Sequence, residues 1–119
     1  MSALLKKTKT GTQTICSKIV ERRTVASMGK GLMFYKKIKD EAHIFYLRVT
    51  RREAITMVFV FFPLDVLFLD EHKKIVEIKE NLKPFANYFP KNKASYVVEL
   101  EKGTVISKKL KLNDELIFS

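Results

Sequence analysis

The pattern of hydrophobic and polar positions changes character along the chain. Residues 12–20 mix β-branched with polar side chains, which is typical of a β-strand. Val25, Met28 and Leu32 are then spaced three and four residues apart, and this spacing predicts a helix over residues 24–33. Two glycines lie within that helix, and each costs about 1 kcal/mol relative to alanine. We therefore expect the helix to be short.

From residue 43 onward the chain is dominated by segments of strand composition, rich in aromatic and branched side chains. Two of them flank a polar loop and predict a hairpin. Residues 81–94 contain two prolines and three aromatic residues, and we interpret them as a connector. A short helical turn is predicted to begin at Gly103. The predicted strands are residues 12–20, 44–49, 54–61, 66–69, 75–78, 95–100 and 116–118.

Six or seven short strands with one or two small helices predict a β-dominated α+β fold with mostly antiparallel strands. Partial closure into a small barrel would hide the strand edges. The length of 119 residues suits one domain. Residues 1–11 are rich in lysine and threonine and are expected to be a loosely ordered basic N-terminus, which leaves residues 12–119 as the domain. The expected core residues are Val58, Val60, Phe62, Leu67, Leu69, Ile75, Val97 and Leu100.

Composition excludes several classes of protein. With one cysteine, Cys16, the chain cannot form an intrachain disulfide or a cysteine-based zinc site, and a small buried thiol is the expected role. The first residues lack the apolar segment of a secretory signal. The apolar run over residues 55–69 is too short for a bilayer span, which needs about 20 residues, and it contains Pro63 and Asp65. These features predict a soluble, cytoplasmic protein.

The net charge of +10 is uneven, because residues 1–52 hold thirteen basic and only three acidic side chains. Basic residues interleaved with aromatic ones are used by proteins that bind single-stranded nucleic acid. Nucleic acid is therefore one partner to consider, although lysines that serve only solubility would give the same composition. The basic residues that could form such a patch are Arg22, Arg23, Lys36, Lys37, Arg48, Arg51 and Arg52.

Asp65 is the one charged residue in the apolar run over residues 55–69. A carboxylate in such surroundings needs hydrogen bonds or a partner charge. Backbone N–H groups of its own turn after Pro63 could supply them. Alternatively, Asp65 and Glu99 could serve as acid and base of a small hydrolase, although alternation on the strand predicts Glu99 to face solvent.

Other candidate residues give weaker signals. Asp114 follows Asn113 and is interpreted as a turn residue, with closure of a pocket beside Asp65 as the alternative. His43 and His72 are the only histidines, and neither has matched partners for a metal. The four glycines match no phosphate-binding loop. No cofactor or metal is therefore predicted.

Several landmarks occur together in a recognisable order: a Gly-Leu-Met-Phe segment at residues 31–34, a Pro-Leu-Asp segment at 63–65 within an apolar strand, and an Asn-Asp turn at 113–114. In this they resemble the domain of unknown function 192 (DUF-192), and in particular its cytoplasmic archaeal-type members. The resemblance implies a compact β-rich domain and supplies no activity. Tyr35 stands where an arginine usually follows the first segment.

These observations favour a non-enzymatic binding or structural module over an enzyme. The candidate binding surface consists of Met33, Asp65 and Asp114. The sequence does not determine the ligand, the partner or the oligomeric state.

Overall fold

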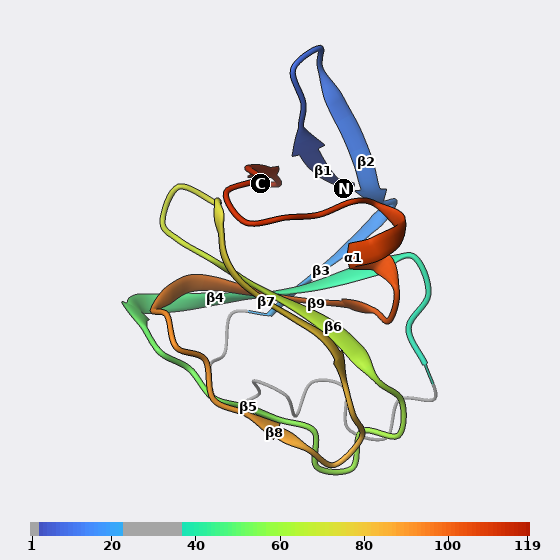
Figure 1. Cartoon of the computed structure of the whole chain (residues 1–119), viewed down its shortest axis with the longest axis vertical. Coiled ribbons are helices and arrows are strands. Elements are labelled where there is room, and N and C mark those ends of the chain that lie inside the picture. The colour runs from blue at the N-terminus through green and yellow to red at the C-terminus, as the bar shows by residue number, and fades with distance from the viewer. Residues whose placement is uncertain (1–2, 23–36) are drawn as a thin grey trace.

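The computed structural model describes residues 3–22 and 37–119, whose strands form three sheets (Figure 1). A five-stranded sheet, in the order β3-β4-β9-β6-β7, crosses the middle of the molecule. A three-stranded sheet, in the order β10-β1-β2, lies at one end, and the pair β5-β8 lies at the other. The elements are β1 (Leu4–Lys7), β2 (Thr12–Cys16), β3 (Lys18–Arg22), β4 (Glu41–Arg51), β5 (Ile55–Thr56), β6 (Leu64–Leu69), β7 (Ile75–Leu82), β8 (Asn87–Tyr88), β9 (Ala94–Glu101), α1 (Thr104–Ser107) and β10 (Leu116–Ile117).

The middle of the central sheet is buried on both faces, and all six residues of β6 are buried. Successive side chains of a strand point to opposite faces, so the sheet separates two apolar cores. The α1-side core contains Ile44 and Leu67 of the sheet together with side chains of β1, β2, α1 and β10. The β5-side core contains Phe45 and Val66 of the sheet together with side chains near β5. A functional group on this sheet therefore belongs to one side or the other.

The N-terminal segment is ordered from β1 onward, so the expectation of a loose tail over residues 1–11 is wrong for this strand. β1 is the middle strand of its sheet, between β10 and β2. Leu4 is fully buried in the α1-side core, and the Lys7 amide donates to the Glu115 carbonyl at 2.9 Å. The lysine- and threonine-rich composition describes the exposed turn beyond β1. Burial of Leu4 and the pairing of β1 with β10 and β2 fix where the strand packs.

Residues 54–61 form a strand only at Ile55–Thr56. The chain then turns, with the Val60 amide donating to the Met57 carbonyl at 3.0 Å and Phe59 in the left-handed region at φ 55°. The turn brings Met57 and Val60 into the β5-side core and leaves Phe59 exposed. A continuous apolar run is compatible with this arrangement as well as with a strand, so composition alone mispredicted it.

Three further differences concern strand boundaries. The predicted strand over residues 12–20 is two strands in different sheets, β2 and β3, separated at Ser17. The predicted connector over residues 81–94 contains β8 and the last residues of β7. The described residues form ten strands, more than predicted. The helix predicted over residues 24–33 lies outside the described residues.

The β-dominated α+β class with mostly antiparallel strands is confirmed, and among the described strands β3 pairs with β4 in parallel. The helical turn predicted at Gly103 is α1. Of the eight expected core residues, six are buried, while Val58 and Phe62 are half-buried. In the described ranges, 3–22 and 37–119, no helix has the length and apolar character to cross a membrane.

Candidate functional site

Asp65 is almost completely buried, and its carboxylate accepts three backbone hydrogen bonds. The Asn81 amide donates to Oδ1 at 2.9 Å, and the amides of Gly103 and Val105 donate to Oδ2 at 3.0 Å each. The expectation of backbone donors is thus confirmed, but that they come from its own turn is wrong. Asp65 lies within β6, and its donors belong to β7 and to the start of α1. It joins three segments that are far apart in sequence.

Asp65 and Glu99 lie on opposite faces of the central sheet. In the pairing of β6 with β9, Asp65 is opposite Leu100 and Glu99 is opposite Val66. Leu100 belongs to the α1-side core and Val66 to the β5-side core. The two carboxylates therefore cannot act together on one substrate atom, as the hydrolase alternative requires. Glu99 is also fully buried, which corrects its expected exposure. Alternation gave the correct face, but this face is covered.

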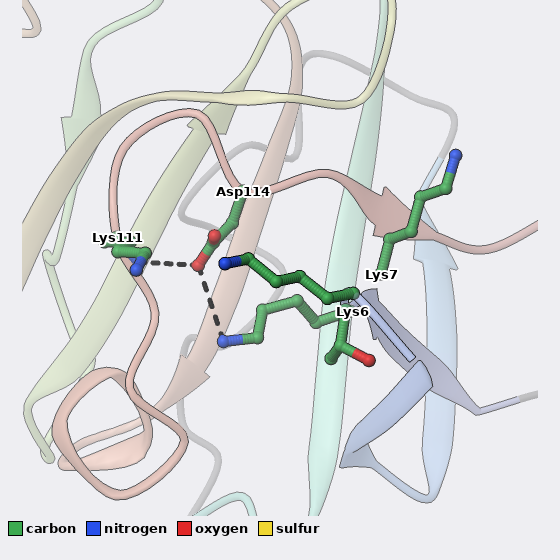
Figure 2. Close-up of a pocket in the computed structure, with 6 residues that line it drawn as sticks. Lys6, Lys7, Lys111 and Asp114 are labelled. Carbon is green, nitrogen blue, oxygen red and sulfur yellow. Dashed lines mark hydrogen bonds and ion pairs between the residues drawn. The ribbon is translucent and has the colours of Figure 1, made fainter. Parts of the chain in front are cut away.

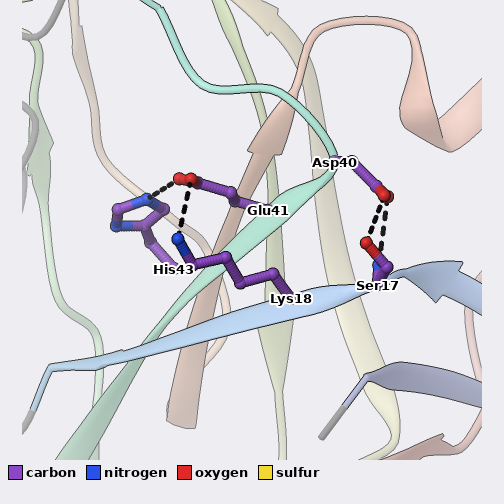
Figure 3. Close-up of polar contacts among 5 residues, drawn as sticks. All are labelled: Ser17, Lys18, Asp40, Glu41 and His43. Atoms are coloured by element: carbon purple, nitrogen blue, oxygen red, sulfur yellow. Dashed lines mark hydrogen bonds and ion pairs between the residues drawn. The ribbon is translucent and has the colours of Figure 1, made fainter. Parts of the chain in front are cut away.

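His43 lies inside β4, fully buried and opposite Glu99 in the β4–β9 register. Its Nε2 lies 3.0 Å from Oε1 of Glu41, whose Oε2 lies 3.6 Å from Nζ of Lys18 (Figure 3). Alongside, Asp40 accepts hydrogen bonds from the hydroxyl and the amide of Ser17, and these lower the pKa of Asp40. These contacts hold the junction between β2 and β3 against the start of β4, which is a structural role.

Glu77 of β7 is another carboxylate that accepts several hydrogen bonds. Its carboxylate accepts hydrogen bonds from the amides of Lys91 and Asn92, at 2.9 Å each to Oε1, and from the Tyr88 hydroxyl. Burial on its own raises the pKa of Glu77, but these hydrogen bonds outweigh it and the pKa is lowered. Burial and the Glu77 carboxylate raise the pKa of Tyr88 to about 12. Like Asp65, Glu77 fastens a loop to the sheet.

Asp114 is a turn residue, in agreement with the favoured interpretation. Its Oδ2 accepts a hydrogen bond from the Lys111 amide at 2.9 Å, and the preceding residue, Asn113, has φ 75°. The alternative placed Asp114 in a pocket beside Asp65. Asp114 does line a pocket, but the residues around it are lysines and a threonine, and Asp65 is not among them.

This pocket, here called the lysine pocket, has a volume of about 450 Å³ and lies where the turn before β10 meets the β1–β2 hairpin (Figure 2). Lys6 extends to Asp114, with 3.6 Å between Nζ and Oδ2, and also donates to the Lys109 carbonyl. The side chain of Lys6 is only 12% exposed, so its position is fixed by packing. The lining residues are Lys6, Lys7, Thr8, Lys9, Lys111 and Asp114.

The lysine pocket carries a surplus of positive charge. Asp114 is shared between Lys6 and the Lys111 amide. Lys7 lies 3.9 Å from Glu115, a distance that gives a weak, largely exposed pair. Within residues 3–22 and 37–119, the ammonium groups of Lys9 and Lys111 make no ion pair. An anion in this pocket would find donors that the protein itself does not use.

The predicted nucleic-acid patch is only partly visible. Lys37 and Arg52 are exposed, and Arg51 is paired with Glu53, with 2.6 Å between Nε and Oε1. Lys37 precedes β4, and Arg51 is the last residue of that strand, so the eleven residues of β4 separate the two positions along the chain (Figure 1). Of the other patch residues, Arg23 and Lys36 lie outside the described residues, as do the side chains of Arg22 and Arg48. Met33 of the candidate binding surface also lies outside them.

Metal and thiol chemistry receive no support from the side chains that the structure describes. Among them there is no cluster of three or more histidine, cysteine, aspartate or glutamate residues that could hold a metal ion. His72 is exposed in its loop. Cys16 is buried, and burial, with a smaller contribution from Asp40, raises its pKa to about 12. A thiol that stays protonated is a poor nucleophile.

Comparison with known proteins shows the family of the chain. The profile of DUF192, described as an uncharacterized family, matches residues 5–118. The chain belongs to this family. The match includes most of β1.

Curated relatives come from archaea. The chain is 33% identical over 86 residues to a UPF0127 protein of Pyrococcus horikoshii, covering 72% of this chain and 74% of that protein. It is 30% identical over 115 residues to a UPF0127 protein of Thermococcus sibiricus, covering 95% and 72%. The match to archaeal relatives agrees with the archaeal-type resemblance. No activity comes with these names.

Two solved structures share the fold. A protein of unknown function from Novosphingobium aromaticivorans has a TM-score of 0.84 at 21% identity, covering 98% of this chain and 84% of that one. A protein of Sinorhizobium meliloti, named as a suspected transcription regulator, has a TM-score of 0.80 at 24% identity, covering 98% and 95%. At these identities the likeness concerns the fold alone.

Sequence reasoning missed the lysine pocket, although its residues come from two lysine-rich stretches that are visible in the sequence. One stretch holds Lys6, Lys7 and Lys9, and the other, residues 108–111, contains three lysines. Their proximity depends on β1 pairing with β10, the last strand of the chain. That long-range pairing left no local signal.

Proposed function

We propose that the protein is a non-enzymatic binding module whose site is the lysine pocket, and that its ligand carries a phosphate group or a similar oxyanion. The observation that carries this proposal is a cavity lined by Lys6, Lys7, Lys9 and Lys111, in which Asp114 is the one carboxylate among the described lining residues and is already occupied. Asp114 belonged to the predicted binding surface. Asp65, the other described member of that surface, acts within the fold instead.

Electrostatics support an anionic ligand. A cavity lined by one sign of charge concentrates ions of the opposite sign. Lysine presents a compact ammonium group with three donors, which suits a phosphate oxygen approached from different directions. Thr8 adds a hydroxyl at the wall of the pocket. The volume of about 450 Å³ lies within the range of small-molecule sites, roughly 300–1,000 Å³.

The test is calorimetric titration with inorganic pyrophosphate, a dense oxyanion, and with a neutral sugar for comparison. The double variant Lys9→Gln/Lys111→Gln removes two donors that no ion pair uses, and it is expected to weaken pyrophosphate binding about tenfold or more. Lys83→Gln is the matched control, because it removes the same charge from an exposed residue near β8, at the far end of the molecule.

Pyrophosphate binding that is weakened by the double variant and not by the control supports the site. Equal weakening by Lys83→Gln would show a response to net charge alone and would overturn the proposal. Binding of the sugar as tight as that of pyrophosphate, or the absence of any binding, would do the same.

Nucleic-acid binding is the second candidate, because the positive surplus lies in residues 1–52 and because a protein of this fold is named as a suspected transcription regulator. The predicted patch adds little to it, since Lys37 precedes β4 while Arg51 ends that strand and is paired with Glu53. A cytoplasmic location is part of this proposal, and cell fractionation would test it.

A further inference from the structure

The β1–β2 hairpin stands out from the body of the protein, along the long axis of the molecule (Figure 1). Its two strands pair in antiparallel register, with Lys7 opposite Thr12 and Lys6 opposite Gln13. The turn is closed by the Thr8 amide, which donates to the Gly11 carbonyl at 2.9 Å. All residues from 7 to 12 are exposed.

The tip of the hairpin is basic and rich in hydroxyl groups. Residues 7–12 read Lys-Thr-Lys-Thr-Gly-Thr, with two ammonium groups, three hydroxyl groups and neither an acidic nor an apolar side chain. The first acidic residue of the whole chain is Glu21. Lysine ammonium groups and threonine hydroxyls are among the groups that contact nucleic-acid phosphates. The tip has no apolar side chain to insert into a lipid bilayer, which disfavours a membrane surface.

The base of the hairpin is held firmly. β1 lies between β2 and β10, Leu4 is buried, and the Lys7 amide bonds to the Glu115 carbonyl at 2.9 Å. At the same base, Lys6 is fixed between Asp114 and the Lys109 carbonyl. The basic hairpin is thus fixed at its base and adjoins the lysine pocket.

We propose that the β1–β2 hairpin is an arm that enters the major groove of double-stranded DNA, while the lysine pocket at its base receives a backbone phosphate. The inference rests on the proposed function, since it identifies the anion of the lysine pocket. The contacts are with phosphates, so binding is expected to depend weakly on base sequence.

The dimensions agree with this assignment. The major groove of B-form DNA is about 12 Å wide and about 8.5 Å deep, and it admits a two-stranded β-ribbon. Three residues of ribbon at about 3.3 Å each are long enough to enter this groove between the two phosphate backbones. The major groove of an RNA duplex is deep and too narrow for side chains to read. The arm therefore favours DNA over RNA of the same sequence.

The experiment measures fluorescence anisotropy of a labelled DNA duplex of about 20 base pairs over a range of salt concentrations, with the intact chain. Phosphate contacts by Lys9 and Lys111, the two lysines of the lysine pocket that make no ion pair among the described residues, predict a log–log salt slope of about −2. Lys9→Gln should reduce the slope by about 1. A duplex RNA of the same sequence and polyaspartate are the competitors.

The decisive variant is Thr10→Glu. Thr10 is exposed at the tip and does not line the lysine pocket. The added charge should weaken DNA binding about tenfold and leave pyrophosphate binding unchanged. Asn87→Glu makes the same charge change on exposed β8, at the far end, and should leave both unchanged.

The outcomes separate the two proposals. Pyrophosphate binding without DNA binding overturns the arm and leaves the proposed function intact. DNA binding that Thr10→Glu does not weaken, or that polyaspartate or RNA displaces as well as DNA does, also overturns the arm. Loss of DNA binding in Thr10→Glu with pyrophosphate binding retained supports the arm.

Discussion

Replacing Asp65 with alanine should destabilise the protein strongly, because the carboxylate satisfies three backbone amides in a buried site. These amides belong to Asn81, Gly103 and Val105, at 2.9–3.0 Å. Leaving a buried donor unsatisfied costs about 1–3 kcal/mol, so three donors give about 3–9 kcal/mol. Domains of this size have about 5–15 kcal/mol in total. Asp65→Ala is therefore expected to remove a large part of the stability.

The assay is urea unfolding followed by far-UV circular dichroism, with the slope m compared between variants. Asp65→Asn keeps the shape and one acceptor oxygen, so it should lose about 2–4 kcal/mol and stay measurable if Asp65→Ala does not fold. Asp70→Ala is the matched control. Asp70 also accepts hydrogen bonds from two backbone amides, those of His72 and Lys74. It lies in an exposed loop, where water can take the place of the carboxylate as acceptor. Its loss should be about 1 kcal/mol or less.

The result that refutes this reasoning is a loss in Asp65→Ala no greater than that in Asp70→Ala, with m unchanged. The buried carboxylate would then carry no net stability, and the three amides would find other partners. Pyrophosphate affinity can be measured in the same variants. An Asp65 variant that folds should keep its affinity for pyrophosphate, because Asp65 does not line the lysine pocket.

Three further predictions concern other groups. Tyr88→Phe removes a hydrogen bond to the Glu77 carboxylate and should cost about 1.5–3 kcal/mol in urea unfolding at neutral pH. The lowered pKa of Glu77 gives stability that is lost as pH falls through its folded pKa. The raised pKa of Tyr88, about 12, gives stability that is complete below pH 10 and lost as pH rises to about 12, so pH-dependent melting should show a plateau. Tyr88→Phe should lower this plateau and extend it on the alkaline side, because the titrating phenol is gone. Cys16 should react with a thiol reagent only at the rate of unfolding, and fast labelling of the native protein would contradict its burial and raised pKa. Gly103→Ala should lose about 1–2 kcal/mol in thermal unfolding, since φ is 92° there, and an unchanged melting temperature would contradict a left-handed Gly103.

Local pattern was enough to predict the class of the fold. Strand composition found β4, β6, β7 and β9, and Gly103 marked the start of α1, because these signals depend on residues close in sequence. Composition failed at residues 57–60, where an apolar run turns and still buries Met57 and Val60. Burial requires that a side chain reach the core, and a turn can achieve that as well as a strand.

The site was harder to predict because it depends on pairings between distant segments. Asp65 was recognised as a carboxylate that needs backbone donors, yet two of its three donors lie 38 and 40 residues away, where the sequence gives no hint of them. Glu99 was placed on the correct face of its strand. Its exposure was mispredicted because alternation shows which side chains share a face and not whether that face is covered.

The buried carboxylates and the basic surface are connected. Asp65 accepts hydrogen bonds from backbone amides, and Glu77 accepts hydrogen bonds from a side-chain amide and a phenol. Each carboxylate therefore satisfies hydrogen-bond donors inside the fold. Neither forms an ion pair with a lysine or arginine among the residues that the structure describes. With these two acids withdrawn from a chain of net charge +10, fewer carboxylates remain at the surface to pair with its lysines. The surplus charge of the lysine pocket and the hairpin thus follows partly from how the fold uses its acidic residues. Returning a carboxylate to that surface, as Thr10→Glu does, is the most direct way to measure what this surplus binds.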